Sequence, residues 1–166
     1  MVARNLFEDT DKKVVIDSFR NEFGFLSNFY ETPVYLDGKR YASAEHAYQA
    51  TKAEDPVDHE VIRKARTPGE AKKLGRAVKL PADWESKKLD VMRRVVREKF
   101  NNPMLAHALL ETKDAELIEA NTWGDKFFGI CRGVGHNWLG KILMETRERL
   151  YKEAVADTLA PTKDDE

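Results

Sequence analysis

The sequence predicts an α+β protein in which a single helix-rich domain packs on a small antiparallel sheet. Residues 84–100 carry apolar side chains at helical spacing, which predicts the longest helix of the chain. Residues 13–19 are rich in β-branched side chains and predict a strand. Residues 33–41 contain a central Asp-Gly pair, which predicts a β-hairpin. Several helical patterns beside a few short strands are typical of this fold class.

Capping and turn residues divide the rest of the chain into shorter elements. Ser43 is a favourable N-cap for a helix over 43–52, and the Thr-Pro-Gly-Glu sequence at 67–70 predicts the start of a helix that ends near residue 77. The other predicted elements are a loop or turn at 23–30, helices at 58–66, 103–111 and 138–153, a strand at 115–120 and a glycine-rich loop at 121–137. We expect a flexible N-terminus at 1–12, one domain at 13–153 and a disordered acidic tail at 154–166.

The composition is that of one soluble globular domain. The 166 residues are 42% hydrophobic and 34% charged, which is sufficient for a sizeable core. No apolar run approaches the roughly 18 residues that span a bilayer, and the N-terminus lacks the apolar stretch of a signal peptide. Cys131 is the single cysteine, which excludes an internal disulfide, and the four histidines lack zinc-site spacing. We therefore expect a cytoplasmic protein that requires neither a membrane nor a metal.

The net charge of −1 conceals a basic segment. Residues 61–100 contain 13 Lys and Arg but only five Asp and Glu. Such a segment indicates either an anionic ligand, such as phosphates or nucleic acid, or a solvated helix surface whose acidic partners lie elsewhere in the chain. Both interpretations stay open at the level of the sequence.

The predicted helix over 43–52 carries an unusual polar stripe. Glu45, Tyr48, Gln49 and Lys52 are spaced so that they share one face of the helix. Such a stripe is either a solvated surface or the floor of a polar pocket. The aromatic, apolar sequence just before this helix favours a position inside the molecule.

The loop at 121–137 contains four glycines, which implies unusual backbone angles or close backbone contacts. It matches neither the dinucleotide-binding glycine motif nor a P-loop. Its last five residues lead into a helix N-terminus, which favours phosphate; the alternative is an ordinary Asn cap behind a flexible loop. Trp123 offers a face for stacking on a base and Asp125 offers a carboxylate; the alternative is a core Trp and a turn Asp. Cys131 has no neighbouring base and is expected to be a small buried residue.

Six motifs in this order resemble a known family. They are Phe25–Phe29, Ser43–Lys52, Leu74–Arg76, Trp84–Phe100, Trp123–Asp125 and Asn137–Gly140. Together they resemble the YbiA-like N-glycosidases, also called the NADAR (NAD and ADP-ribose) family, over roughly residues 14–151. The resemblance implies the YbiA-like fold.

The resemblance also implies an enzyme that hydrolyses the bond between ribose C1 and a nitrogen. The implied substrates are phosphorylated ribosyl nucleobases, either ADP-ribosyl-guanine or a ribosylamino-pyrimidine intermediate of riboflavin synthesis. ADP-ribosylated nucleic acid is a further candidate partner. Cleavage of this bond builds positive charge on the ribose, which a carboxylate near C1 stabilises. No metal and no cofactor is required by this scheme.

The resemblance assigns roles to residues of this chain. Glu45 is the expected carboxylate at C1, and Asp125 is the expected proton donor or ribose ligand. The expected substrate-binding residues are Arg20, Lys52 and Asn137 for phosphates, Phe29, Tyr48 and Trp123 for the base and ribose, Asn28 and Gln49 for ribose hydroxyls or the water, and the motif glycines Gly124 and Gly140.

Two other classes of function compete with an enzyme. The same pocket in a non-catalytic binding module would hold ADP-ribose or a related nucleotide without cleaving it, and would not need a carboxylate at C1. A nucleic-acid-binding protein would use the basic segment at 61–100 and would not need a pocket; its affinity would fall steeply with salt.

Overall fold

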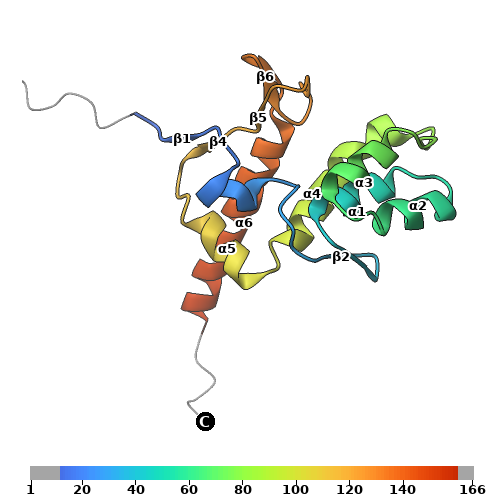
Figure 1. Cartoon of the computed structure of the whole chain (residues 1–166). Coiled ribbons are helices and arrows are strands. Elements are labelled where there is room, and N and C mark those ends of the chain that lie inside the picture. Colours follow the sequence, from blue (N-terminus) through green and yellow to red (C-terminus); the bar gives the residue numbers. More distant parts are fainter. Residues whose placement is uncertain (1–11, 161–166) are drawn as a thin grey trace, which may run out of the picture.

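The computed structural model describes residues 12–160 as a helix-rich structure with seven very short strands (Figure 1). In chain order the elements are β1 (Val15–Ile16), the 3-10 helix η1 (Asn21–Leu26), β2 (Val34–Leu36), β3 (Lys39–Tyr41), α1 (Ala44–Thr51), α2 (Pro56–Arg63), α3 (Pro68–Gly75), α4 (Trp84–Lys99), α5 (Pro103–Leu110), β4 (Glu116–Leu117), β5 (Ala120–Asn121), β6 (Ile130–Cys131), β7 (Val134–Gly135) and α6 (Trp138–Leu159).

Helix α4 joins the two sides of the molecule. On one side, α1, α2, α3 and the β2–β3 hairpin pack together, and α1 and β2 contact α4; on the other side α6 packs on α4, and α5 packs on α6 (Figure 1). Met92, Val95 and Val96 of α4 are almost completely buried. Full burial of a side chain of this size contributes about 1.5–3 kcal/mol, so α4 is a major part of the core.

Helix α1 lies inside the molecule, since every residue from Ala44 to Ala50 is buried. Ser43 is its N-cap, as predicted, and its hydroxyl accepts the N–H of His46 at 3.2 Å. The buried His46 ring bonds to the Ser43 hydroxyl through Nδ1 and to the Ala65 carbonyl through Nε2, at 2.7 and 3.0 Å. Capping and a satisfied core histidine therefore fix this helix at its start.

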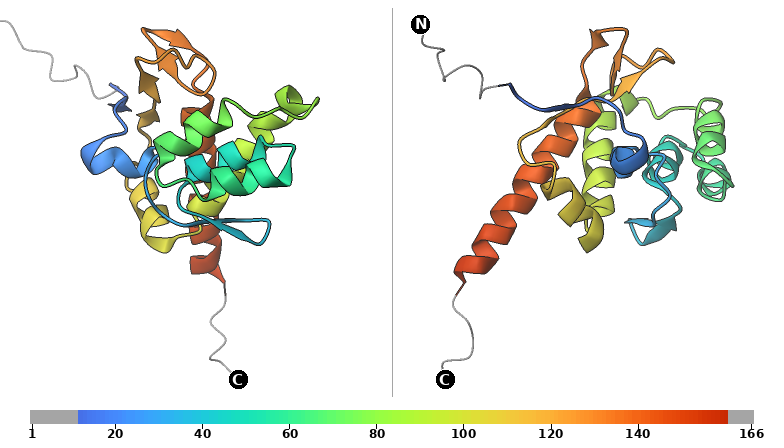
Figure 2. Two further views of the ribbon diagram at one scale, coloured as in Figure 1. Left: turned by 45° about the vertical axis from the view of Figure 1, so that its right-hand side comes forward. Right: turned by 60° about the vertical axis from the view of Figure 1, so that its left-hand side comes forward.

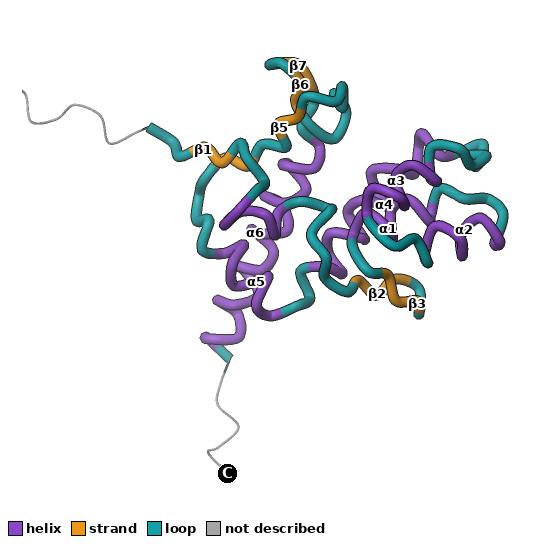
Figure 3. The backbone as a smooth tube through the Cα atoms, viewed as in Figure 1, coloured by secondary structure: helices purple, strands orange, loops and turns teal. Residues whose placement is uncertain are grey.

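The α+β class is confirmed, but the expectation of one antiparallel sheet needs correction. The strands form three separate small sheets (Figure 3). The hairpin β2–β3 is antiparallel, as its Asp-Gly turn predicts, whereas β1 pairs parallel with β4. In the third sheet β6 pairs parallel with β5 and antiparallel with β7. Each of these pairings covers only two or three residues, so the helices supply most of the core.

Several helix boundaries differ from those predicted. The stretch expected as a loop at 23–30 begins as the 3-10 helix η1, and α2 starts at Pro56, two residues before the predicted start. Helix α6 continues to Leu159 although the tail was expected from 154, and its residues 151–159 are all exposed. Figure 2 shows this end of α6 projecting past the other elements. The rest of the expected tail and almost all of the expected flexible N-terminus lie outside the described residues. Within residues 12–160, no helix is long and apolar enough to cross a membrane.

A first prediction concerns the close contact of α1 with α3. A Cβ added at Gly75 would collide with Gln49 Oε1 and would lie 3.1 Å from Gln49 Cβ. Gly75→Ala should therefore destabilise the fold by about 1–3 kcal/mol, with a melting temperature several degrees lower. Gly69→Ala on the same helix is the control, because its added Cβ would meet only an ordinary contact at 3.9 Å. Equal melting temperatures for the two variants would contradict the close packing.

Candidate active site

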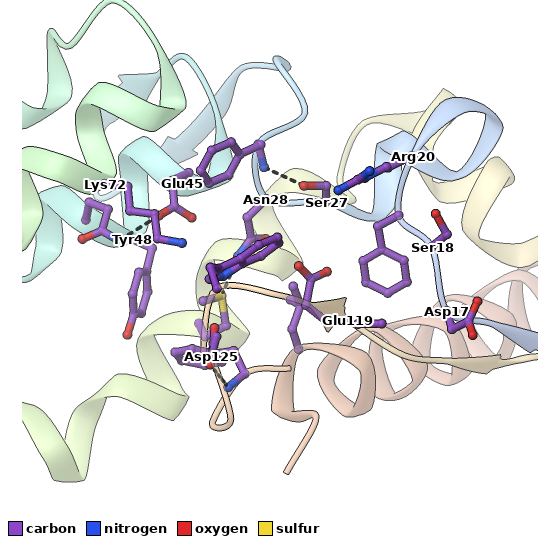
Figure 4. A pocket seen from close by; sticks show the side chains of 18 of the residues that line it. Asp17, Ser18, Arg20, Ser27, Asn28, Glu45, Tyr48, Lys72, Glu119 and Asp125 are labelled. Carbon is purple, nitrogen blue, oxygen red and sulfur yellow. Dashed lines mark hydrogen bonds between the residues drawn. The ribbon is translucent and has the colours of Figure 1, made fainter. Parts of the chain in front are cut away.

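A cavity of about 700 Å³ opens between the helices and the loops (Figure 4). Its walls come from α1, α3, α4, the start of α6, the segments that flank η1 and the segment 119–128. The volume lies in the range of small-molecule sites. The cavity therefore collects side chains from most of the length of the chain.

The polar stripe of α1 forms part of this wall. Glu45, Tyr48, Gln49 and Lys52 all line the cavity; the first three are buried and Lys52 is half-buried. Of the two interpretations of the stripe, the polar pocket is therefore correct. The backbone also contributes, because the N–H of Glu45 donates to the Asn28 carbonyl at 3.0 Å and ties the start of α1 to the adjacent segment that follows η1.

The carboxyl group of Glu45 is 7% exposed and has a defined partner. Gln49 Nε2 donates to Glu45 Oε1 at 2.7 Å. Burial raises the pKa of Glu45, and the hydrogen bond from Gln49 opposes that shift. The positive charges of Lys72 and Lys52 also favour the ionised form. Glu45 is thus a carboxyl held in one orientation, with a proton affinity above that of an exposed glutamate.

A second carboxyl, Glu119, was missed by the sequence analysis. It lines the cavity from the connection between β4 and β5, and its Oε2 is buried with no hydrogen-bond partner among residues 12–160. Burial, followed by the negative charge of Asp125, raises the pKa of Glu119 to about 7. Glu45 adds to this effect. A glutamate with this pKa holds or releases a proton near neutral pH.

Asp125 completes a group of three carboxyls around one space (Figure 4). Its Oδ1 accepts the N–H groups of Phe127 and Phe128 at 3.0 and 2.9 Å. Asn121 holds the same residue through its backbone, accepting the Asp125 N–H at 3.0 Å and donating to the Asp125 carbonyl at 2.7 Å. The sequence allowed Asp125 to be either a turn residue or a carboxylate for a ligand. The structure combines the two, because Asp125 caps the turn and also lines the cavity.

Cations gather at the part of the cavity formed by α1 and α3. Lys52, Lys72 and Arg76 line it there, whereas Arg20 lies at the opposite end in the view of Figure 4. Burial lowers the pKa of Lys52 and the nearby Glu45 opposes this shift. The charges of Arg76 and Lys72 lower it further, which places these cations close to one another. Such a cluster favours the binding of an anionic group.

The basic segment at 61–100 contributes both to a candidate anion site and to a solvated helix surface, the two interpretations that the sequence left open. Lys72 and Arg76 face the cavity. Most of the other basic side chains form ion pairs with acids, several of them from outside the segment: Arg63–Glu60, Arg66–Glu70, Lys79–Glu54, Lys87–Asp83, Lys88–Glu85, Arg93 with Asp90 and Glu145, and Arg94–Asp37. The segment is therefore mainly a paired, solvated surface.

Two exposed aromatic rings lie beside one of the cavity cations. Phe29 and Trp123 line the cavity with 44% and 52% of their surface exposed. The ammonium of Lys72 lies 5.6 Å from the centroid of Phe29 and 5.1 Å from that of Trp123. Tyr48 differs, because its ring is buried in edge and tilted contacts with Phe128 and Trp84. Phe29 and Trp123 are thus the rings available to a flat ligand.

Three of the expected substrate-binding residues lie outside this cavity. Gly124, at φ +93°, lines a smaller hollow of about 400 Å³ that Trp123 also lines. The side chain of Asn137 accepts the N–H of Glu119 at 3.0 Å and donates to the Leu117 carbonyl at 2.9 Å. A Cβ at Gly140 would collide with that same carbonyl. The expected phosphate contact at Asn137 is therefore corrected to a role in holding the Glu119 backbone, and Gly140 allows α6 to pack there.

Other lining residues also escaped the sequence analysis. Besides Glu119 they include Asp17, Ser18, Lys72, Arg76 and Met92. The basic segment was the only signal for Lys72. Arg76 also belongs to the family motif Leu74–Arg76, but no role was assigned to it, and no sequence pattern distinguished Glu119 from a surface acid on a strand. Cys131 is buried, as expected. Within the described residues, no group of three or more His, Cys, Asp and Glu side chains is arranged to hold a metal ion.

Comparison with known proteins gives the class of this fold and site. Residues 10–151 match the NADAR domain model. The chain is 39% identical over 140 residues to the N-glycosidase YbiA of Escherichia coli, covering 82% of this chain and 87% of that protein. The solution NMR structure of E. coli YbiA superposes with a TM-score of 0.79 at 35% identity and 92% coverage of both chains. The chain belongs to the NADAR family, which confirms the resemblance seen in its motifs.

Two further relatives carry different names. A riboflavin biosynthesis protein of Vibrio vulnificus is 42% identical over 135 residues, which cover 79% of this chain. That match spans only 36% of the Vibrio protein, so this chain corresponds to about a third of it. An N-glycosidase of Nostoc punctiforme is 36% identical over 135 residues, covering 77% of this chain and 86% of that protein.

The raised pKa of Glu119 gives a second prediction, about stability. Because the folded pKa of about 7 exceeds the ordinary value of 4.5, the fold favours the protonated form. Stability is therefore full below about pH 4.5 and falls as the pH rises to about 7, by up to about 3 kcal/mol. Glu119→Gln removes this loss, so its melting temperature should exceed that of the wild type by several degrees at pH 8 and by little at pH 4.5.

The control for this experiment is Glu31→Gln, which alters an exposed carboxyl outside the cavity. Melting temperatures are measured at both pH values for the three proteins. A Glu119→Gln variant that is equally stabilised, or destabilised, at both pH values would contradict the raised pKa.

Proposed function

We propose that this protein is an N-glycosidase that hydrolyses the bond between ribose C1 and a nitrogen of a base in a phosphorylated ribosyl nucleobase. The observation that carries the proposal is the group of three carboxyls, Glu45, Glu119 and Asp125, in one cavity with a cluster of cations and two exposed aromatic rings. Each of these features matches one part of such a substrate. The relatives named N-glycosidases support the same class of reaction.

Glu45 is the proposed carboxylate at ribose C1. As the bond to the base breaks, positive charge develops on the ribose, and a carboxylate close to C1 stabilises it or activates the attacking water. The hydrogen bond from Gln49 orients the carboxylate in advance, so little reorganisation is needed in the transition state. The ionised form is the active one in this scheme. Burial raises the pKa of Glu45, and the hydrogen bond from Gln49 and the charges of Lys72 and Lys52 oppose that shift.

Glu119 is the proposed proton donor to the departing base. A base leaves more easily when its nitrogen receives a proton, and a donor with a pKa near 7 is protonated in part of the population at neutral pH. Two carboxyls in different surroundings within one site are a usual arrangement for acid and base roles. Asp125 raises the pKa of Glu119 and, in this scheme, also faces a ribose hydroxyl.

The remaining lining residues fit the rest of the substrate. Lys52, Lys72 and Arg76 form the proposed phosphate site, which replaces the one expected at Asn137. Phe29 and Trp123 offer the proposed stacking faces for a base. Both ADP-ribosyl-guanine and a ribosylamino-pyrimidine phosphate contain these groups, and the name of the Vibrio relative, a riboflavin biosynthesis protein, favours the second.

A non-catalytic ADP-ribose-binding module is the alternative. It would use the same cations and aromatic rings. It would gain nothing from burying mutually repelling carboxyls beside an anionic ligand, since each of them weakens the binding of phosphate. The three carboxyls therefore favour the enzyme.

The third prediction tests this proposal directly. Glu45→Gln keeps the size of the side chain and an acceptor for Gln49, but it removes the charge. Turnover should fall by about 100-fold or more, while the affinity for ADP-ribose changes by only a few-fold. Turnover is measured by incubating each protein with ADP-ribosyl-guanosine and, separately, with a ribosylaminouracil phosphate, and by detecting free base and sugar by mass spectrometry.

The two substrates and the variant give distinct outcomes. Release of base from one compound by the wild type identifies the substrate class, and its loss in Glu45→Gln places that residue in the reaction. Tight binding of ADP-ribose without release of base from either compound would support the binding module. Near-normal turnover by Glu45→Gln would remove Glu45 from the mechanism.

The fourth prediction concerns the stacking face of Trp123. Base stacking on an aromatic side chain contributes about 1–3 kcal/mol, so Trp123→Ala should weaken substrate binding by roughly 10- to 100-fold.

The neighbouring carboxylate should behave differently. Asp125→Asn should lower the turnover number more than the affinity, since the interaction of Asp125 with the substrate strengthens in the transition state. Tyr35→Ala removes an exposed ring from the hairpin, away from the cavity, and serves as the control. Parallel losses of melting temperature, affinity and turnover in both site variants would reduce the loop to a scaffold.

A further inference from the structure

Lys99 is buried behind the cavity rather than in its wall. It lies at the last position of α4 and is 1% exposed. Its Nζ donates to the Ser27 carbonyl at 2.7 Å and lies 5.7 and 5.3 Å from the ring centroids of Tyr30 and Phe100. Within residues 12–160, it forms no ion pair with a carboxylate. Burial of such a group is unfavourable, and it lowers the pKa of Lys99 to about 7.

The Ser27 carbonyl is the central acceptor of a turn. Besides Lys99, it accepts the N–H of Tyr30 at 3.1 Å, and the Ser27 hydroxyl accepts the N–H of Phe29 at 3.1 Å. Ser27, Asn28 and Phe29 all line the cavity. The ammonium of Lys99 therefore fixes the base of a turn, residues 27–30, that presents three residues to the proposed site.

The same turn is connected to Glu45. The Asn28 carbonyl accepts the N–H of Glu45 at 3.0 Å, and Asn28 Nδ2 contacts Met92 Sδ at 3.3 Å. A continuous path of hydrogen bonds and backbone thus runs from Lys99 through Ser27 and Asn28 to the first turn of α1. Displacement of the turn would move Phe29 and the Glu45 backbone together.

We propose that Lys99 is a positioning residue of the active site: its buried hydrogen bond to Ser27 holds the turn 27–30 so that Phe29, Asn28 and Glu45 keep their relative places around the substrate. The catalytic part of this inference rests on the proposed N-glycosidase function. The geometric part, that Lys99 holds the turn and its contact with α1, is independent of the substrate.

The energetics separate positioning from simple packing. A methionine has nearly the shape of the lysine and no charge, so it would fill the same space at a smaller desolvation cost. Replacement of buried charged groups by apolar ones of similar size is often neutral or stabilising. A lysine that only filled space in the core would therefore be replaceable by methionine, whereas one that places the turn would be required for activity even though its burial costs stability.

The test is Lys99→Met in the full-length protein. We expect a melting temperature equal to or above that of the wild type. We also expect faster hydrogen exchange, by about tenfold or more, at the amides of Tyr30 and Glu45, because these N–H groups bond to the two ends of the path. The kcat/KM should fall by about 10- to 100-fold, the usual effect of a small displacement of catalytic groups. Lys87→Met makes the same change at a largely exposed position on α4, and should leave exchange and kcat/KM unchanged.

Other results would overturn the inference. Unchanged exchange at both amides would show that Lys99 does not hold the turn. Loss of folding, or a melting temperature that falls in parallel with activity, in Lys99→Met and also in the polar variant Lys99→Gln would make it a scaffold residue. If the wild type cleaves neither test compound, the proposed function fails, but the exchange rates and the ADP-ribose affinity of Lys99→Met still decide whether Lys99 positions the cavity wall.

Discussion

The close packing of α1 against its neighbours is the constraint on which the rest of the structure depends. Apart from the ring of Tyr48, the apolar residues of this helix are small, and Ala44, Ala47 and Ala50 are completely buried. Small side chains allow α3 to approach until Gly75 touches Gln49. Large apolar residues on α1 would hold the helices apart and fill the cavity. The cavity therefore depends on the burial of α1, a helix with a polar face. That burial requires the alanines of α1 and Gly75 of α3 where the two helices meet their neighbours.

Enclosure of the polar face has an electrostatic consequence. Burial raises the pKa of Glu45 and of Glu119, the negative charge of Asp125 adds to both shifts, and the charge of Lys72 opposes both only in part. A fold selected for stability alone would expose or pair these groups. The unfavourable burial of these carboxyls is concentrated in the cavity, where a substrate with developing positive charge would compensate for it. The stability lost near neutral pH and the proposed chemistry therefore have the same physical origin.

The segment that completes the cavity is held by polar contacts rather than by apolar packing. Asn137, at the start of α6, accepts the backbone N–H of Glu119. The side chain of Asn121 bonds to both the N–H and the carbonyl of Asp125. These amides replace the regular hydrogen bonds that strands of two residues do not supply. Trp123 is left exposed at the bend between them. A side chain also bonds to the backbone in the turn 27–30, where Lys99 donates to the Ser27 carbonyl.

Local patterns in the sequence determined much of the secondary structure. The caps at Ser43 and Thr67 and the Asp-Gly turn act through adjacent residues, so these helix starts and the hairpin were predictable. The stripe on α1 named four lining residues because they share one helix face, and the family motifs pointed to Trp123 and Asp125.

Only the tertiary structure decided what depends on distant parts of the chain. The pairing of β1 with β4 joins segments about a hundred residues apart, and two-residue strands have no periodicity that would reveal their direction. Glu119 and Lys72 look like ordinary surface charges until the fold encloses them. Asn137 looked like a ligand contact because a helix N-terminus favours anions, yet its left-handed backbone turns the side chain toward Leu117 and Glu119. Helix capping depends only on neighbouring residues, so the sequence determines it. The burial and the proton affinity of the cavity side chains arise only when remote segments of the chain exclude water from the same space.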